Sequence, residues 1–378
     1  MLTTVSSAEN SLIIVPTVRN PGVITDYVRN AESCGHDLNR FFFLILTEDF
    51  VDIDQYKAIL KQCGVSGEIF NEKSRRQYLR DNGLSEFDSL IPRKSHAETS
   101  FGLLYMWIDD TYKYGFMIDD DTRPIPEFDF FSSHLSNLNY AGELECVSSD
   151  RNWVNVLYQS YSKRKLYPRG YPYSRMGERV KKTTVNVLKG TDVLLSQGLW
   201  TNVPDLDAIR ILMDGDLNGQ SKTRLDISDF KNSFTVEKGN FTTVCSMNVA
   251  FRREIIPAFY QFPMDDNPFK IGRFDDIWSG IIAKRVIDEI NGYMITGYPL
   301  CEHNKAPRST FRDIMSEAPG YESNELISET VAEAEPGEYD ILEFTQVIAK
   351  KLESDGKTEF IKYCGKYLSN WCEMLHNI

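Results

Sequence analysis

Gly115-Phe116-Met117-Ile118-Asp119-Asp120-Asp121 is the stretch that decides how this chain folds. Its first four residues predict a short buried strand, and three carboxylates follow that strand directly. In open α/β sheets, ligands bind at the carboxyl ends of the strands. Because adjacent anions repel one another, a bound cation is their natural compensation, and carboxylate oxygens completed by substrate phosphates suit Mn²⁺ or Mg²⁺. The stretch predicts a strand whose tip binds a divalent metal; an acidic turn that caps the next segment is the alternative.

Strands and helices alternate on the N-terminal side of this stretch. Short apolar runs predict buried strands over residues 12–15, 41–46 and 67–70. Apolar residues at helical spacing predict helices over residues 23–31, 53–63 and 101–108. This order favours a mostly parallel sheet covered by helices on both faces. The predicted class is α/β and Rossmann-like, although no glycine-rich dinucleotide fingerprint or phosphate loop follows a strand.

The second half of the chain differs from the first in composition and in its pattern of predicted elements. From about residue 145 the alternation weakens and aromatic, Arg and Gly residues become dense, which suits a substrate pocket. Residues 275–290 predict a helix with its apolar residues on one side. Residues 316–339 are acidic and carry Pro and Gly, so they predict a linker, followed by amphipathic helices over 341–352 and 360–371. We therefore expect a catalytic domain over residues 1–315, and a linker with C-terminal helices over residues 316–378.

Charge and composition exclude several classes of protein. The net charge of −13 argues against a nucleic-acid partner. No apolar run approaches the roughly 20 residues of a transmembrane helix, and the N-terminus does not resemble a signal peptide. Seven scattered cysteines without a C-x-x-C pair favour a reduced, cytoplasmic protein, at most peripheral to a membrane-bound glycan assembly site. A phosphate-bearing substrate would then need a cation or a few well-placed Arg and Lys side chains.

Polar and aromatic residues beyond the triplet form further candidate sites. Pro16, Thr17 and Arg19 follow the first predicted strand and could bind a base or phosphate, or form an ordinary turn. Asp49 follows the second strand and suits ribose hydroxyls or a helix N-cap. The other candidates for contacts with a nucleotide and its attached group are Lys94, Asp119, Asp120, Trp200, Asn248 and Lys305.

Three later segments combine turn residues with reactive side chains. They are residues 169–175, 197–207 and 272–278. They could form the lip of a pocket, an aromatic platform for a sugar, and a group of acids at a helix start; a surface turn, a packing Trp and a helix N-cap are the alternatives. The candidate catalytic residues are Arg169, Arg175, Asp205, Asp207, Asp275 and Asp276. The candidate metal ligands are Asp119, Asp121 and His303.

The order of these motifs resembles the reversibly glycosylated polypeptide family, which includes the UDP-arabinopyranose mutases. The likeness covers roughly residues 10–310, and its most specific segments are residues 198–208 and 272–278. It implies a glycosyltransferase A-type fold, Mn²⁺ or Mg²⁺ at the acidic triplet and a UDP-sugar substrate. It also implies interconversion of pyranose and furanose forms, with glycosylation of one arginine that corresponds to Arg169. The family has a second important arginine seven residues later, where this chain has Met176 preceded by Arg175.

The resemblance makes a flavin-independent nucleotide-sugar mutase, acting on a UDP-arabinose-like sugar, the first expectation. A metal-dependent glycosyltransferase that uses the same donor site and a glycan or lipid-linked acceptor is the second. A non-catalytic partner in an oligomer is the third; the intact acidic triplet and Arg169 argue against it. Homo-oligomers, or hetero-oligomers with other family members, are compatible with all three.

Overall fold

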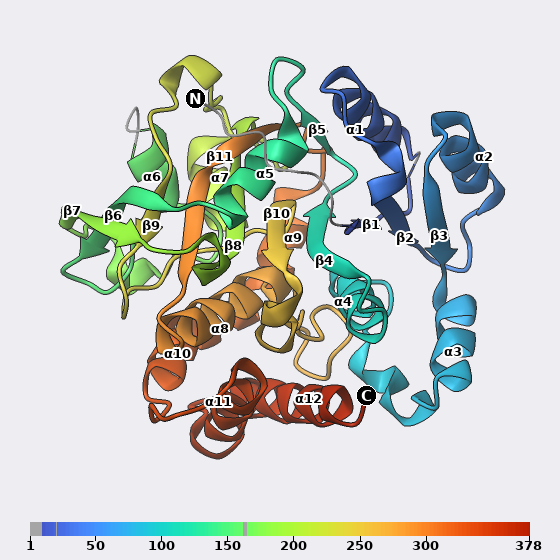
Figure 1. The fold of residues 1–378 in the computed structure, drawn as a ribbon. Coiled ribbons are helices and arrows are strands. Elements are labelled where there is room, and N and C mark those ends of the chain that lie inside the picture. Colours follow the sequence, from blue (N-terminus) through green and yellow to red (C-terminus); the bar gives the residue numbers. More distant parts are fainter. Residues whose placement is uncertain (1–9, 20, 162–164) are drawn as a thin grey trace.

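The stretch that ends in the acidic triplet is a central strand of one large sheet (Figure 1). The structure is a computed structural model, which describes residues 10–19, 21–161 and 165–378. In it, β4 (Tyr112–Ile118) lies between β1 and β10 and is buried on both faces. Burial on both faces explains why its sequence is a continuous apolar run rather than an alternation. The expected α/β class is confirmed.

The N-terminal half of the sheet is parallel, as its alternating sequence predicts. β1 (Asn10–Pro16) pairs with β2 (Phe41–Leu46) on one side and with β4 on the other, and β3 (Ser66–Phe70) extends the order beyond β2. Ile13 lies opposite both Phe43 and Phe116 in this register. Parallel strands end at the same edge of the sheet, so the acidic triplet shares an edge with the residues that follow β1.

The other half of the sheet is mixed, which the sequence did not predict. β10 (Asn248–Arg252) is inserted antiparallel between β4 and β8 (Val193–Asn202), and β11 (Tyr293–His303) runs parallel to β8. β9 (Phe234–Val236), β6 (Gly142–Ser149) and β7 (Val180–Val187) complete the order. The short β5 (Thr122–Pro124), directly after the triplet, pairs with the end of β11 and sets Thr122 opposite His303. This last pairing brings His303 beside the acidic triplet.

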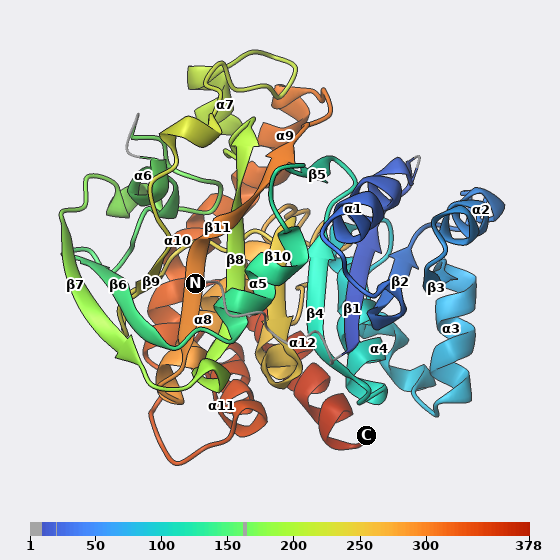
Figure 2. The same cartoon turned by 45° about the horizontal axis from the view of Figure 1, so that its top comes forward.

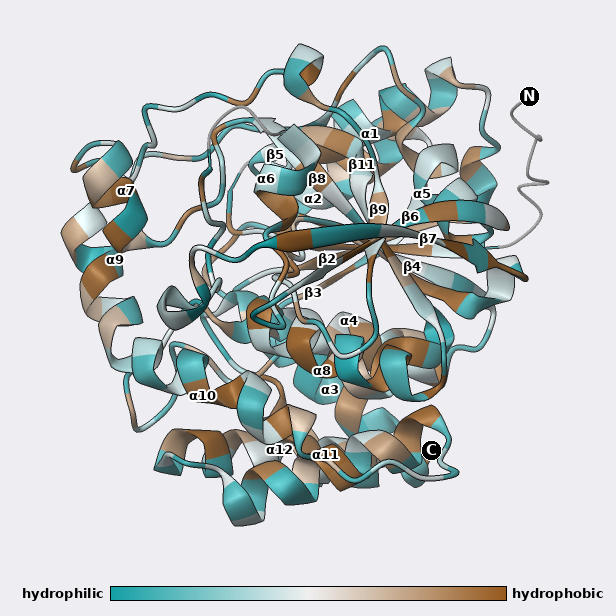
Figure 3. Ribbon diagram, turned by 90° about the vertical axis from the view of Figure 1, so that its left-hand side faces the viewer, coloured by the Kyte–Doolittle hydropathy of each residue, from teal (hydrophilic) through white to brown (hydrophobic). Residues whose placement is uncertain are grey.

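Helices cover both faces of the sheet, and a further helical layer lies beyond one of them. α1 and α5 lie on one face and α4 and α8 on the other, with α11 and α12 outside α8 (Figures 1 and 3). The α-helices are α1 (Gly22–Ser33), α2 (Asp54–Cys63), α3 (Glu72–Asp81), α4 (Thr99–Ile108), α5 (Phe130–Leu138), α6 (Val156–Tyr161), α7 (Ala208–Asp214), α8 (Asp275–Glu289), α9 (Thr310–Glu317), α10 (Tyr321–Ala332), α11 (Ile341–Asp355) and α12 (Glu359–His376). The 3₁₀ turns are η1 (Leu38–Arg40), η2 (Ser85–Leu90), η3 (His96–Glu98), η4 (Tyr173–Arg175), η5 (Gly190–Asp192), η6 (Ile227–Asp229), η7 (Arg253–Phe259) and η8 (Ala318–Gly320).

Two expectations about the C-terminal half need correction. Residues 316–332 of the segment predicted to be a linker form the end of α9, η8 and α10, and Ile327 and Val331 of α10 are fully buried; only residues 333–339 are outside helices and strands. The helix at residues 275–290 exists as α8, but every residue in it except Arg285 and Glu289 is buried rather than one side only. The reason is that α10 and α11 pack on the side that would otherwise face water (Figure 2). The predicted domain boundary at residues 315/316 falls inside α9.

The seven cysteines are free thiols, and five of them are buried. In the part of the chain that the structure describes, no helix has the length and apolar character needed to cross a membrane.

Candidate active site

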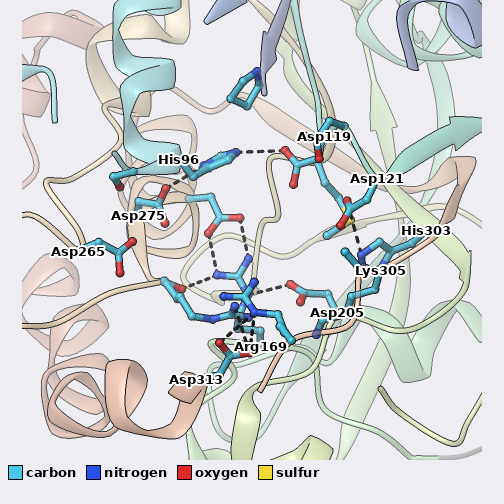
Figure 4. Close-up of a pocket in the computed structure, with 18 of the residues that line it drawn as sticks. His96, Asp119, Asp121, Arg169, Asp205, Asp265, Asp275, His303, Lys305 and Asp313 are labelled. Carbon is cyan, nitrogen blue, oxygen red and sulfur yellow. Dashed lines mark hydrogen bonds and ion pairs between the residues drawn. The ribbon is translucent and has the colours of Figure 1, made fainter. Parts of the chain in front are cut away.

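A cavity of about 630 Å³ opens at the edge of the sheet where β1, β4, β8 and β11 end (Figure 4). Its walls come from segments far apart in the sequence, because parallel strands deliver their ends to one edge. The lining residues are Pro16, Arg19, Lys94–His96, Asp119–Asp121, Arg169, Asp205, Met247, Asp265, Arg273, Asp275, Asp276, His303–Ser309 without Asn304, Arg312 and Asp313. Acidic and basic side chains therefore share one polar cavity.

The three carboxylates of the triplet point to different partners. Asp120 accepts a hydrogen bond from Thr17 Oγ1 at 2.7 Å and pairs with Arg19 at 3.1 Å. Burial is the main cause that raises the pKa of Asp120, and the charges of Asp119 and Asp121 add to it. The pKa of Asp121 is raised by burial and then by Asp119. The triplet thus carries crowded negative charge that Arg19 compensates only in part.

His303 faces this charge with a defined nitrogen. Its Nδ1 lies 2.7 Å from the carbonyl oxygen of Val203, which can only accept, so Nδ1 carries a proton. In the neutral ring, Nε2 then presents a lone pair, and it lies 3.8 Å from Asp121 Oδ1. A carbonyl that fixes the tautomer in this way is typical of metal-binding histidines. Asp119, Asp121 and His303 are therefore the residues that could hold a divalent cation, although the described residues contain no preformed cluster of three or more such ligands.

His96 bridges two acidic side chains of the cavity. Its Nε2 lies 3.1 Å from Asp119 Oδ1 and its Nδ1 lies 2.9 Å from Asp275 Oδ2. Burial would lower the pKa of His96, but the two carboxylates outweigh it and raise the pKa well above its usual value. Sequence reasoning missed His96, because its partners are 23 and 179 residues away and the local sequence holds no signal for the bridge.

Arg169 is buried at the floor of the cavity between two carboxylates. Its Nε donates to Asp205 at 2.9 Å, and its two terminal nitrogens each lie 3.1 Å from an oxygen of Asp276. The carbonyl oxygen of Arg273 and the sulfur of Cys245 accept the remaining N–H groups. Burial opposes the charge of Arg169, yet Asp205 and Asp276 raise its pKa well above the usual value. All five N–H donors of the guanidinium group are therefore occupied.

Lys305 is a buried cation with the opposite surroundings. Its Nζ has no hydrogen-bond partner among the described residues, although the side chain is 8% exposed. Burial lowers the pKa of Lys305 to about 8, while Asp205 opposes that shift. An unpaired buried ammonium group is costly, so an anionic ligand that reached it would be stabilised.

A second basic group comes from residues that the sequence analysis did not select. Arg273 donates through Nε to Glu317 at 2.6 Å and lies 3.5 Å from Asp313, which also pairs with Arg308. Arg273 has a φ of +67°, in the left-handed region that a residue other than glycine rarely adopts. The sequence signal for Arg273 was its position within the motif at residues 272–278. Asp313 and Glu317 both lie on α9; Asp313 comes just before the segment predicted to be a linker, and Glu317 lies within it.

The structure brings most of the sequence-predicted residues to this cavity. Those that line it are Pro16, Arg19, Lys94, Asp119, Asp120, Asp121, Arg169, Asp205, Asp275, Asp276, His303 and Lys305. Thr17 lies directly behind the lining, where it donates to Asp120.

The remaining five predicted residues lie outside the lining, either in the core or with other partners. Trp200 is 1% exposed in the core, and Asn248 ties β10 to β8 and β11 through the carbonyl oxygens of residues 199 and 299. Asp207 caps α7 and accepts from Tyr173 Oη. Asp49 is exposed and accepts from the backbone N–H of residue 73. Arg175 pairs with Glu329 at 3.0 Å and does not line the cavity, whose arginines besides Arg169 are Arg19, Arg273, Arg308 and Arg312.

Comparisons with known proteins show which family the chain is similar to. Probable UDP-arabinopyranose mutase 1 of Pisum sativum is 29% identical over 304 residues, which cover 78% of this chain and 70% of that protein. UDP-arabinopyranose mutase 3 of Arabidopsis thaliana is 29% identical over 310 residues with the same coverage. Among solved structures, glucosyl-3-phosphoglycerate synthase of Mycobacterium tuberculosis matches with a TM-score of 0.42 and 12% identity, over 85% of this chain and 80% of that one. The model of the reversibly glycosylated polypeptide family matches residues 84–372. The chain belongs to the reversibly glycosylated polypeptide family.

Proposed function

We propose that this protein is a nucleotide-sugar mutase that interconverts the pyranose and furanose forms of a UDP-sugar of the arabinose type. Family membership and the names of the relatives support this reaction. The observation that carries it is the juxtaposition of an acidic triplet, an unpartnered buried lysine and a buried arginine in one cavity. Each would meet one part of a UDP-sugar. The triplet, with a bound cation, would compensate the charge of the diphosphate, the lysine would bind its anionic oxygens, and the arginine would lie beside the anomeric carbon.

The basic residues suit the diphosphate. Lys305 offers a buried ammonium group with free donors, and Arg308 lies close enough to share Asp313 with Arg273. As the bond between the anomeric carbon and the diphosphate breaks, its electrons leave with the phosphate oxygen. The cations next to that oxygen stabilise the charge that develops there.

The donors at the triplet fit a divalent cation. Asp119, Asp121 and His303 would hold Mn²⁺ or Mg²⁺, since two carboxylates and a neutral imidazole leave positions for phosphate oxygens. When bound, the cation would neutralise the diphosphate and act as a Lewis acid on it. Arg19 and Thr17 both contact Asp120, so the remaining carboxylates would bind the metal: Asp121, which faces His303, and Asp119, which would exchange its contact with His96 for the cation.

Arg169 suits the anomeric carbon. In the proposed reaction the sugar is transferred from the diphosphate to a nitrogen of Arg169, its ring opens and recloses through a different hydroxyl, and the diphosphate returns. Asp205 and Asp275 line the cavity, and in this proposal they would accept hydrogen bonds from sugar hydroxyls. A sugar retained on Arg169 is part of this proposal.

The test is to incubate purified protein with UDP-arabinopyranose and Mn²⁺ without any acceptor, and to separate the UDP-sugars by chromatography. The expected product is the UDP-arabinofuranose isomer. Release of UDP only after addition of a glycan or lipid-linked acceptor would establish a glycosyltransferase instead, a reading that the removal of Arg175 from the cavity favours. Binding of UDP without turnover under either condition would indicate a non-catalytic family member.

A further inference from the structure

Arg169 cannot act on a diphosphate through its hydrogen bonds. Each of its five N–H groups already has an acceptor: Asp205, two oxygens of Asp276, the carbonyl oxygen of Arg273 and the sulfur of Cys245. Lys305, by contrast, has no partner in the part of the chain that the structure describes. Lys305 can therefore donate to a diphosphate without giving up a contact, whereas Arg169 cannot, which leaves Arg169 for the reacting carbon. A guanidinium group has no free lone pair, so it must lose a proton before a nitrogen can form a bond.

The two carboxylates at Arg169 are placed differently for taking that proton. Asp276 lies along both terminal nitrogens, with one oxygen 3.1 Å from each. Asp205 contacts only Nε, the inner nitrogen that carries the rest of the side chain and is less accessible to a carbon atom. A proton that leaves either terminal nitrogen thus moves along an existing hydrogen bond to Asp276.

The surroundings of the two carboxylates also favour Asp276 over Asp205 as the proton acceptor. Burial raises the pKa of Asp205, but Arg169 and then Lys305 outweigh burial and hold that pKa well below its usual range. Burial also raises the pKa of Asp276, and here the neighbouring charge of Asp275 helps to keep it raised against the effect of Arg169. Two carboxylates whose surroundings separate their pKa values in this way commonly divide the acid–base roles.

The backbone holds Asp276 in position for this role. Its Oδ1 accepts from its neighbour's N–H, that of Ile277, at 2.9 Å, and its Oδ2 accepts from the N–H of Ser246 at 3.2 Å. Asp276 is in the first turn of α8, so a buried helix fixes its backbone. The carboxylate therefore cannot turn away from the guanidinium plane without losing two hydrogen bonds.

We propose that Asp276 is the general base that activates Arg169. In this step the bond between the anomeric carbon and the diphosphate oxygen breaks and its electrons leave with the oxygen. An N–H bond of a terminal nitrogen breaks, its proton goes to Asp276, and its electron pair forms the new bond from nitrogen to the anomeric carbon. The products are a glycosylated guanidinium ion, a neutral Asp276 carboxyl group and free UDP, and the reverse step returns the proton. The assignment rests on the proposed mutase reaction.

The experiment compares Asp276→Asn with the matched control Asp205→Asn. Both changes replace a carboxylate that binds the same guanidinium group with a neutral amide of the same size. Protein is incubated with UDP-arabinose labelled in the sugar, and the rate of label retention, the isomerisation rate and the affinity for UDP are measured. We expect Asp276→Asn to slow label retention and isomerisation by at least about 100-fold while UDP affinity changes less than about threefold. We expect Asp205→Asn, which removes a cavity carboxylate that contacts only Nε of Arg169, to slow label retention at least about tenfold less than Asp276→Asn does.

Label retention at the wild-type rate in Asp276→Asn would overturn the proposal, as would an equal loss in the two variants. If Asp276→Asn does not fold, Asp276→Glu and Asp205→Glu provide the same comparison with the charge retained, and the larger loss is again expected at residue 276. A wild-type protein that binds UDP but neither retains label nor isomerises would overturn the mutase reaction itself, and this assignment with it. Isomerisation without any retained label, still lost in Asp276→Asn, would overturn the arginine adduct and with it the role of Asp276 as its base, while the mutase reaction would stand.

Discussion

Lys305 and Arg169 are both buried cations of the cavity, but only Arg169 is fully hydrogen-bonded. The donors of Arg169 are satisfied inside the protein, whereas Lys305 Nζ has no partner among the described residues. A buried cation without a partner destabilises the free protein, and proteins retain such groups where a ligand needs them. This difference in hydrogen bonding is why we assign Arg169 to the reaction and Lys305 to ligand binding.

We predict that Lys305→Met stabilises the ligand-free protein and weakens UDP binding. Removing an unpaired buried ammonium group should raise the free energy of unfolding by about 1–2 kcal/mol. Loss of a charged contact to the diphosphate should lower UDP affinity at least about tenfold. Urea denaturation and UDP titration measure the two effects, with the exposed Lys366→Met as control. A variant that is less stable than the wild type with unchanged UDP affinity would show that Lys305 is a structural residue.

Glu98 gives the protein a pH dependence that lies outside the cavity. Burial, and then the charge of Glu48, raise the pKa of Glu98 to about 8, while Arg75 and His96 oppose the shift. In the unfolded chain a glutamate titrates near about 4.3, so the folded state binds the proton more tightly. The stability that this contributes is fully present below about pH 4.3 and is lost as the pH rises through about 8.

We therefore predict that Glu98→Gln removes a loss of stability between pH 5 and pH 8.5. The wild-type loss from this group should be of the order of a few kcal/mol, and the neutral amide should not show it. Urea denaturation of both proteins at the two pH values measures the difference, with the exposed Glu338→Gln as control. Parallel stability curves for wild type and Glu98→Gln would mean that Glu98 stays ionised in the folded protein.

The sequence identified individual residues well where a strand ends and poorly where a strand is interior. Asp119, Asp121 and His303 follow or finish strands, and strand ends of a parallel sheet meet at one edge. Trp200 and Asn248 have equally polar or aromatic side chains, but they lie on β8 and β10, which are buried on both faces. A buried polar atom on such a strand needs a hydrogen-bond partner inside the protein, and Asn248 finds its partners on neighbouring strands.

At the scale of elements, the N-terminal half was predictable because its signals are local. Each strand there is a short apolar run and each helix has its own periodicity, so neither depends on distant residues. The insertion of β10 antiparallel between β4 and β8 has no local signature, because it is fixed by pairing with two strands that are distant in the sequence. The acidic composition of residues 316–339 predicted a linker, but burial of a few residues of α10 against α8 is sufficient to order it.

The helical layer of α10, α11 and α12 has its own anchor residues. Trp371 of α12 is fully buried and stacks on Tyr260 with ring centroids 5.0 Å apart, and Trp278 of α8 hydrogen-bonds Asn324 of α10. The layer covers the side of α8 that is turned away from the sheet (Figure 3). Since Asp275 and Asp276 lie at the start of α8, this layer supports the active-site wall from behind.

We predict that Trp371→Ala destabilises the protein by about 3–5 kcal/mol while Trp371→Phe costs much less. Truncation to alanine leaves a cavity in the core, whereas phenylalanine keeps the ring packed on Tyr260. The indole Nε1 has no hydrogen-bond partner among the described residues, so the phenylalanine variant loses no such bond. Thermal or urea denaturation measures both variants, and UDP affinity at low temperature should be unchanged in Trp371→Phe. Equal destabilisation in the two variants would point to an indole hydrogen bond instead.

At the scale of the whole molecule, the sheet gathers opposite charges that its composition does not reveal. The net charge is −13, and the triplet with Asp265 and Asp275 continues that sign inside the cavity. Lys305 and Arg308, between β11 and α9, and Arg273, just before α8, reverse it on another wall of the cavity. An anionic substrate is therefore attracted by placed cations and not by the overall field of the protein. This arrangement suits a negatively charged ligand that binds where the acidic wall of the cavity meets its basic wall.

The final prediction is that Mn²⁺ and UDP stabilise the protein cooperatively. Without metal, Asp121 is the least compensated acid of the triplet: Arg19 and His303 lie 3.9 and 3.8 Å from it, whereas Arg19 pairs with Asp120 and His96 with Asp119 at 3.1 Å each. Metal alone lacks the phosphate ligands, and UDP alone meets uncompensated carboxylates, so each should bind weakly. Together they should raise the free energy of unfolding by about 1–3 kcal/mol more than the sum of their separate effects. Thermal denaturation with each ligand, both, or neither measures this coupling.

Asp121→Asn should abolish the coupling yet keep the shift caused by UDP alone, while Asp265→Asn, which changes another acid of the cavity lining, should retain the coupling. Additive shifts in the wild type, or full coupling in Asp121→Asn, would place the metal away from the triplet or remove it from the site.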